Sequence, residues 1–190
     1  MNKFYCSLGL MSGTSGDGVD ASIIQSDGDT DYKVISDKYF KYNRDIHRNL
    51  HNLKDKINNL NDLGYFEKEI KEIENQITLF HAKAVDEITK NYKKKIDFIG
   101  FHGQTIFHNA KQKISKQLGD GKLLSKLTKK TVVYNFREND LRNNGQGAPL
   151  TPIFHEIVAR KNNIDLPVCV LNLGGIANIT LIKDDDYNSL

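Results

Sequence analysis

Apolar residues form short runs at the start of the chain and recur at helical spacing in its middle. Residues 4–11, 19–26 and 32–40 are apolar or alternating runs separated by turns rich in Gly and Asp, which predicts three strands. The period then changes to three and four over residues 63–91, which predicts a long helix with one apolar face on a core. That face consists of Leu63, Phe66, Ile70, Ile73, Ile77, Phe80, Ala84 and Ile88. Residues 43–58 predict a shorter helix before it.

The rest of the chain alternates between strand and helix. We expect strands at 96–101, 131–136, 167–173 and 178–183, and helices at 122–129 and 150–161. Three strands followed by alternating helix and strand are typical of an α/β fold with a mixed sheet covered by helices. This is the element order of the ribonuclease-H-like fold, which actin, hexokinase and Hsp70-type ATPases use twice. We therefore expect a first domain over residues 1–166 and the first hairpin of a second domain over residues 167–190.

Two hairpins of this chain share one pattern, an apolar strand, a turn rich in glycine and a returning strand. Their turns lie at 12–18 and 174–178, roughly 160 residues apart. Glycine lets the backbone approach an anion closely and present several N–H groups to it. The first turn adds the hydroxyls of Thr14 and Ser15, and Asp17 and Asp20 could hold Mg²⁺ through water. Two such turns facing one cleft predict a site for a phosphate chain, and the sequence lacks the Walker and dinucleotide glycine motifs.

Composition excludes several other classes of protein. The chain carries 27 Lys and Arg against 24 Asp and Glu, and this net charge of +3 is too small to indicate nucleic-acid binding. No apolar run is long enough to span a membrane, and no leader peptide is recognisable at the N-terminus. Cys6 and Cys169 lie in apolar runs and are expected to be buried, reduced thiols. We therefore expect a cytoplasmic protein with neither a nucleic-acid nor a membrane partner.

Four segments, taken together, resemble the anhydro-N-acetylmuramic acid kinases of bacterial cell-wall recycling. The segments run over residues 9–20, 100–108, 135–150 and 171–178. The resemblance implies ATP and Mg²⁺ as cofactors and 1,6-anhydro-N-acetylmuramic acid as the small-molecule substrate. ATP would phosphorylate O6 while water opens the anhydro ring, giving N-acetylmuramic acid 6-phosphate.

The resemblance also implies roles for the two glycine-rich turns. The family usually has a bulky residue where Gly16 stands, so the first turn is expected to be looser here. The residues expected at the ATP phosphates are Gly13, Thr14, Ser15, Gly16, Asp17, Gly18, Val19 and Asp20, together with Gly174 and Gly175.

A second group of residues is expected to bind the sugar. His102, Gln104 and Thr105 would follow the C-terminal end of a strand, where open α/β sheets place ligands. Arg137 fits a carboxylate or a phosphate because its guanidinium binds either in a bidentate manner. Asp140 and Gln146 complete the expected set. Two plainer alternatives remain: His102 as a loop histidine bonded to nearby backbone, and Asp140 as an ordinary loop carboxylate.

No catalytic residue is assigned within this chain. The family's general base is the aspartate of an Asp-Thr-Gly-Pro stretch, and none of Asp184, Asp185 and Asp186 is followed by Thr-Gly-Pro. The chain is therefore expected to be a front portion, incomplete or inactive alone, that acts as a homodimer or with a complementing second-half chain. Two alternatives remain: a phosphohydrolase of the same superfamily, and a non-catalytic split-gene product. The phosphohydrolase would have no use for the His-Gly-Gln-Thr and Gln-Gly-Ala-Pro loops.

Overall fold

A three-stranded antiparallel meander opens the fold. The computed structural model describes residues 3–174 and 177–183. The first strands are β1 (Tyr5–Ser12), β2 (Gly18–Ser26) and β3 (Tyr32–Lys41), and the helices that follow are α1 (Arg44–Lys56), α2 (Leu60–Tyr65) and α3 (Glu67–Thr89). Alternate residues of β1, such as Leu8 and Leu10, point into the core, as the period of a strand requires. The predicted meander is confirmed.

β4 (Phe98–Asn109) is the longest strand and organises the sheet around it. It runs parallel to β1 on one side. On its other side the first half pairs with β6 (Val132–Tyr134), and the second half pairs with β5 (Ile114–Leu118) after the 3₁₀ turn Ala110–Gln112. The six-stranded sheet has the order β3-β2-β1-β4-β5 with β6 beside β4, so parallel and antiparallel pairs are mixed and the predicted α/β class is confirmed.

The sequence placed the end of this strand too early. His102, Gly103, Gln104 and Thr105 lie inside β4, not in a loop after it, and β5 was not expected at all. Gly103 interrupts the apolar pattern, but its positive φ of 72° is accommodated within the strand beside a register shift against β1. Such irregularities bend a strand without ending it.

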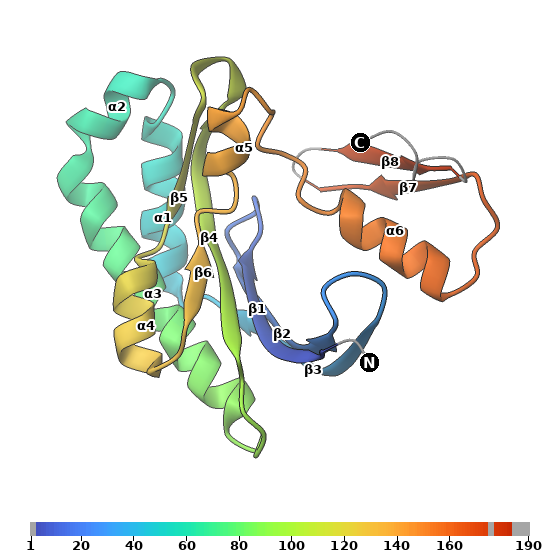
Figure 1. Cartoon of the computed structure of the whole chain (residues 1–190). Coiled ribbons are helices and arrows are strands. Elements are labelled where there is room, and N and C mark those ends of the chain that lie inside the picture. The colour runs from blue at the N-terminus through green and yellow to red at the C-terminus, as the bar shows by residue number, and fades with distance from the viewer. Residues whose placement is uncertain (1–2, 175–176, 184–190) are drawn as a thin grey trace.

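Helices α1, α3 and α4 (Gly121–Thr128) cover one face of this sheet (Figure 1). The apolar stripe of α3 is buried as predicted, with Ile70, Ile73 and Ile77 at most 5% exposed. The predicted single helix 63–91 is, however, two helices. Asn59 and Asp62 form a reciprocal capping box that starts α2, and α2 ends at Tyr65, so that Phe66 separates it from α3.

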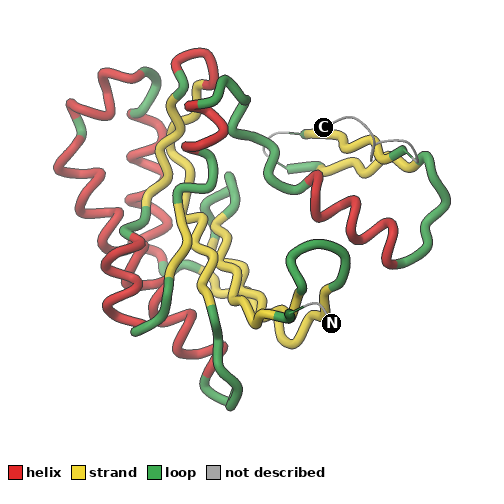
Figure 2. Tube along the Cα trace, viewed as in Figure 1, coloured by secondary structure: helices red, strands yellow, loops and turns green. Residues whose placement is uncertain are grey.

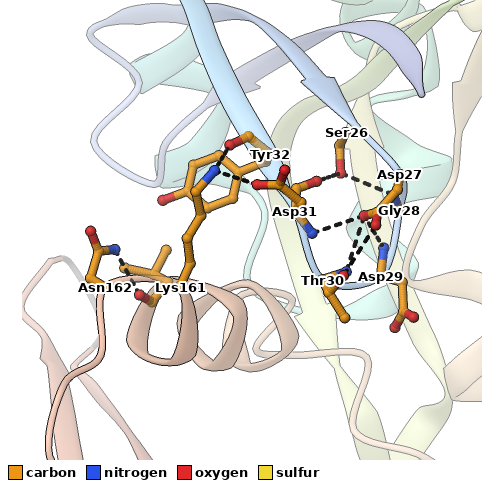
Figure 3. Close-up of polar contacts among 10 residues, drawn as sticks. Ser26, Asp27, Gly28, Asp29, Thr30, Asp31, Tyr32, Lys161 and Asn162 are labelled. Atoms are coloured by element: carbon orange, nitrogen blue, oxygen red, sulfur yellow. Dashed lines mark hydrogen bonds and ion pairs between the residues drawn. The ribbon is translucent and has the colours of Figure 1, made fainter. Parts of the chain in front are cut away.

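The C-terminal elements lie on the opposite side of the sheet (Figures 1 and 2). They are α5 (Glu138–Arg142), α6 (Pro152–Lys161), β7 (Val168–Asn172) and β8 (Asn178–Ile182). β7 and β8 form a separate two-stranded sheet, and His155 of α6 lies 2.9 Å from the Thr180 hydroxyl of β8. Lys161 joins α6 to the meander through Asp31, at 2.5 Å, and the carbonyl of Tyr32 (Figure 3).

The two cysteines have different surroundings. Cys6 is buried in β1 with its sulfur 3.0 Å from the Tyr92 hydroxyl, as expected. Cys169 is also a free thiol but is exposed, because β7 belongs to a two-stranded sheet that buries little of its surface. The prediction of burial was wrong for Cys169. No helix in the described part of the chain is long and apolar enough to cross a membrane.

Candidate functional site

The turn between β1 and β2, residues 13–17, is the first part of the candidate site. Gly16 donates its N–H to the carbonyl of Gly13 at 3.0 Å and adopts a φ of 71°, a conformation that favours glycine. The Gly13 carbonyl also accepts from the Gln104 amide at 3.0 Å, and the Thr14 carbonyl accepts from Lys54 at 2.5 Å. The carbonyl groups at the start of the turn are therefore directed toward the protein.

This orientation determines where the amides of the turn point. In a trans peptide the C=O and the following N–H point in opposite directions. The N–H groups of Thr14 and Ser15 therefore face away from Gln104 and Lys54, and neither has a hydrogen-bond partner among the described residues. Both residues are exposed. Two free amides beside two hydroxyls form the kind of backbone concavity that binds anions.

Ser12 anchors the turn from below, in a network that is entirely buried. Its hydroxyl lies 2.6 Å from Gln104 Oε1 and 2.9 Å from the Gly18 carbonyl, and it accepts from the Tyr42 hydroxyl at 3.0 Å. Burial raises the pKa of Tyr42 to about 12, so Tyr42 keeps the proton that it donates. The backbone N–H of Tyr42 also donates to the Asp17 carbonyl at 2.8 Å. Both ends of the turn are thus fixed from within the core.

Gln104 is a support for this turn in the structure. Its side chain is completely buried, its Oε1 accepts from Ser12, and its Nε2 donates to the carbonyls of Gly13 and Thr105. All of these hydrogen bonds of Gln104 lie within the protein, and its expected contact with the sugar stays a prediction. Thr105 likewise accepts from Gln117 at 3.1 Å and lies within β4, not in a loop.

His102 and Arg137 form the second part of the site. Arg137 donates from Nε and Nη2 to His102 Nε2 at 3.2 and 2.9 Å. Since a guanidinium can only donate, His102 accepts at Nε2 and carries its proton on Nδ1, which donates to the Gly103 carbonyl at 2.8 Å. Burial, and then the charge of Arg137, lower the pKa of His102, so the ring is neutral. His102 is thus bonded to nearby backbone, as the plainer alternative has it, and its expected contact with the sugar stays a prediction.

Arg137 and Asp140 together hold the loop that follows them. Arg137 Nη1 donates to the Gly147 carbonyl at 2.6 Å, and the Gly147 N–H donates to the Asp140 carboxylate at 2.6 Å. A side chain at Gly145 would collide with that carboxylate, and Gly147 has a φ of 66°, so both glycines are required by the loop. These contacts use three of the five N–H groups of Arg137 and leave two for a ligand. Gln146, between the glycines, is exposed.

A pocket of about 610 Å³ lies beside His102 and extends over β1 and β2, although no residue of the turn 13–17 lines it. It lies on the face of the sheet that is not covered by α1 and α3. Asp20 and His102 both line it, and Phe136, Leu150 and Phe154 provide apolar walls. A site with apolar walls and a few polar groups is typical of small-molecule binding.

The remaining predicted residues have varied surroundings. Val19 is fully buried in the core, so only its backbone is available to a ligand. Asp17 and Asp20 are exposed, and both contribute, after burial, to the raised pKa of Tyr39, which places the two carboxylates near one ring. Gly174 lies just beyond β7, which ends at Asn172. Gly175 and residues 184–186 lie outside the described residues.

The sequence analysis missed Ser12, Tyr42 and Lys54, which support the turn. Ser12 and Tyr42 could have been identified from the sequence, because a hydroxyl at the end of a buried strand needs a hydrogen-bond partner. Lys54 stands four residues from Leu50 on an amphipathic helix and looked like an ordinary solvated residue. Its approach to the turn depends on the tertiary packing of α1.

Comparison with known proteins agrees with the motifs. Residues 5–188 match the family model for anhydro-N-acetylmuramic acid kinase. The chain is 64% identical over 190 residues to the anhydro-N-acetylmuramic acid kinase of Pelagibacter ubique, covering all of this chain and 51% of the relative. It is 37% identical over 189 residues to that of Rhizobium johnstonii and 35% over 183 residues to that of Brucella abortus, covering 97% and 94% of this chain.

The chain spans about half the length of the curated relatives that it matches. Within that half, the family match covers nearly every described element and both parts of the site. The mixed sheet with helices on one face agrees with the actin- and hexokinase-like fold of this family. The chain therefore belongs to the anhydro-N-acetylmuramic acid kinase family.

Proposed function

We propose that this chain binds the phosphates of MgATP and part of the sugar for a kinase reaction. The reaction would convert 1,6-anhydro-N-acetylmuramic acid to N-acetylmuramic acid 6-phosphate with hydrolytic opening of the anhydro ring. The observation that carries the proposal is the pair of unpartnered amides at Thr14 and Ser15, held in place by the Gln104 and Ser12 bonds. An anion at this turn would gain two backbone donors without any rearrangement.

The metal would belong to the same turn. Asp17 and Asp20 are exposed carboxylates on either side of Gly18, where β2 begins. In nucleotide sites, Mg²⁺ keeps much of its water and takes one or two carboxylates. The donor set therefore fits a hydrated Mg²⁺ on the phosphate chain. The metal would neutralise charge on the transferring phosphoryl group.

Arg137 is the residue that we assign to the anionic part of the sugar. It is half-buried, and burial lowers its pKa, but a guanidinium remains charged at any physiological pH. The neutral His102 and the Gly147 carbonyl hold it by three hydrogen bonds, and its two remaining N–H groups could bind the lactyl carboxylate. Asp140 and Gln146 would act through the shape of the loop 145–147.

We also propose the domain division predicted from the sequence, with residues 1–166 as a first unit and residues 167–190 as the start of a second. The separate two-stranded sheet of β7 and β8 supports it. α6, although it lies before this boundary, packs on β8 and would form part of the contact between the units.

Mass spectrometry of the reaction product tests the function. The chain is incubated with MgATP and 1,6-anhydro-N-acetylmuramic acid in ¹⁸O-labelled water, alone and together with the other half of the Pelagibacter ubique relative. We expect the 6-phosphate with one ¹⁸O at the anomeric carbon in the combined reaction. This activity should fall strongly with Arg137→Met and stay unchanged with Arg142→Met, since Arg142 is exposed and pairs with Glu138. ATP hydrolysis without sugar phosphate would indicate a phosphohydrolase instead.

A further inference from the structure

Two histidines of α1 face the candidate phosphate turn from outside. His47 and His51 are four residues apart, so they lie on the same side of the helix, and their ring centroids are 4.3 Å apart. Asp17 of the turn faces them, with its Oδ1 3.8 Å from His47 Nε2. One donor atom from each of the three residues lies within 4.8 Å of the other two.

His51 supplies a second, independent observation. Its Nε2 is buried and has no hydrogen-bond partner among the described residues. Leaving such an atom without a partner is unfavourable, because the atom has lost its bonds to water and gained none in the protein. Gly16 lies directly beside it: a Cβ there would be 3.5 Å from His51 Nε2 and 2.9 Å from Leu50 Cδ2. A side chain at Gly16 would therefore collide with Leu50 and occupy the position next to this nitrogen.

We propose that Asp17, His47 and His51 form a binding site for a divalent first-row transition metal of the zinc class. Two imidazole nitrogens and one carboxylate oxygen are ligands that Zn²⁺ accepts, with water or a ligand oxygen in the fourth position. Zn²⁺ binds such ligands at about 2.0–2.2 Å, so the three donors must draw together by roughly 1 Å. The side chains of His47 and Asp17 are 46% and 55% exposed and have room to do so.

The metal would connect α1 to the turn. Asp17 belongs to the segment 13–17, whereas both histidines belong to the helix that also supplies Lys54 to the Thr14 carbonyl. Lys54 lies close enough to Asp17 for the two charges to interact. Its positive charge would therefore oppose a cation bound at Asp17. The site does not depend on nucleotide binding, and it differs from a hydrated Mg²⁺ in its nitrogen ligands.

Zinc and cobalt binding to the full chain, with any polyhistidine tag removed, test the proposal. Calorimetry against a competing chelator measures the affinity for Zn²⁺, and the visible absorption of Co²⁺ reports its coordination. Without nucleotide, whose phosphates would hold the Mg²⁺ that we assign to Asp17 and Asp20, we expect one Zn²⁺ per chain and no competition by Mg²⁺. His47→Ala, His51→Ala and Asp17→Asn should each weaken binding by more than about tenfold, since losing even a group that only supports a ligand costs about 10–100-fold. Lys54→Met should strengthen it.

Matched controls distinguish this site from adventitious binding. His108→Ala removes an exposed histidine of β4, and Asp45→Asn removes an exposed carboxylate of α1, so both should bind Zn²⁺ as the unaltered chain does. Circular dichroism and urea unfolding confirm that each variant folds. Histidine-selective NMR of the unaltered chain gives an answer without substitution, because Zn²⁺ should shift the His47 and His51 ring signals. Absence of binding, equal affinity in the three variants, or shifts confined to other histidines would overturn the proposal.

Discussion

Ser12 and Gln104 stand opposite each other in the parallel register of β1 and β4, and the Ser12 hydroxyl lies 2.6 Å from Gln104 Oε1. This pair joins two segments that are 92 positions apart in the sequence. It places the Gln104 amide against the first carbonyl of the turn that we assign to phosphate. The residue that we expected to touch the sugar therefore supports the turn that we assign to phosphate.

Replacing Gln104 with Ala should reduce both stability and nucleotide affinity. The change removes one hydrogen bond each from the buried Ser12 hydroxyl and the Gly13 carbonyl, which keep other partners, and each lost bond costs about 0.5–1.5 kcal/mol. Urea unfolding measures the stability, and calorimetry with MgATP measures the affinity. Gln117→Ala is the matched control, because its amide is only partly buried and bonds to Thr105 on β4 and to Ser115 on its own strand. Equal losses in both variants would contradict a special role for Gln104.

Two glycine-to-alanine substitutions should change the free energy of unfolding in opposite directions. A Cβ at Gly18 would collide with the Phe40 carbonyl and lie 2.8 Å from Tyr39, so Gly18→Ala should destabilise the chain by about 1–3 kcal/mol through overpacking. Gly64 lies in α2 with no heavy atom within 4 Å of a Cβ, so Gly64→Ala should stabilise by about 0.5–1 kcal/mol. Thermal and urea unfolding of both variants measure the two changes. A neutral Gly18→Ala would mean that β2 and β3 are further apart than described.

His81 should make the fold sensitive to acid. It is fully buried in α3, donates from Nδ1 to the Ile77 carbonyl at 2.8 Å, and lies 4.9 Å from the ring of Phe101. Burial lowers its pKa from 6.5 to about 4. The unfolded chain therefore takes up a proton below pH 6.5 that the folded chain refuses, so stability is fully present above that pH and falls by roughly 3 kcal/mol toward pH 4.

Unfolding free energies measured from pH 7.5 to pH 4 test this effect. Between pH 6.5 and 4, the free energy of unfolding of the His81→Leu variant should fall less steeply than that of the unaltered chain, because the contribution of His81 is gone. His108→Gln should lose a smaller part of the slope, because burial and the charge of Arg137 also lower the pKa of His108 but this residue is exposed on β4, whereas His81 is fully buried. An unchanged slope in His81→Leu would show that burial does not lower the pKa of His81 in the folded chain.

Removing Arg137 should change the protonation of His102. The charge of Arg137 is one of the causes that lower the pKa of His102, and its N–H groups hold the Nε2 lone pair. In Arg137→Met the pKa of His102 should rise, which an NMR titration of the histidine ring signals measures directly. Arg142→Met should leave that pKa unchanged. The same result in both variants would contradict the described pairing of Arg137 with His102.

The sequence predicted the elements better than their ends. The strands of the meander and the stripe of α3 could be predicted because apolar periodicity records which face is buried. The continuation of β4 through His102 and Gly103 could not, since glycine is read as a terminator and only the pairing with β1, β5 and β6 keeps the strand extended. The break at Phe66 leaves the stripe intact, so no periodicity records it.

The candidate site, too, could be predicted from the sequence only where its structure is local. Glycine and hydroxyl composition located the turn at 13–17, because the conformation of a turn is local. The partners that hold it come from distant segments: Tyr42 after β3, Lys54 on α1 and Gln104 on β4. Burial then decides their roles, and burial of a polar side chain cannot be read from its own neighbours in the sequence.

The central claim is that the turn 13–17 binds a phosphate chain through its backbone, and amide chemical shifts test it most directly. Magnesium tripolyphosphate and MgATP are titrated separately into the ¹⁵N-labelled chain, with adenosine as the control. Our account predicts that both phosphate ligands shift the amides of Thr14 and Ser15 most strongly, that adenosine does not, and that Gln104→Ala weakens the effect. Saturating ligand that leaves these two amides unmoved, or that shifts amides elsewhere on the chain, would contradict it.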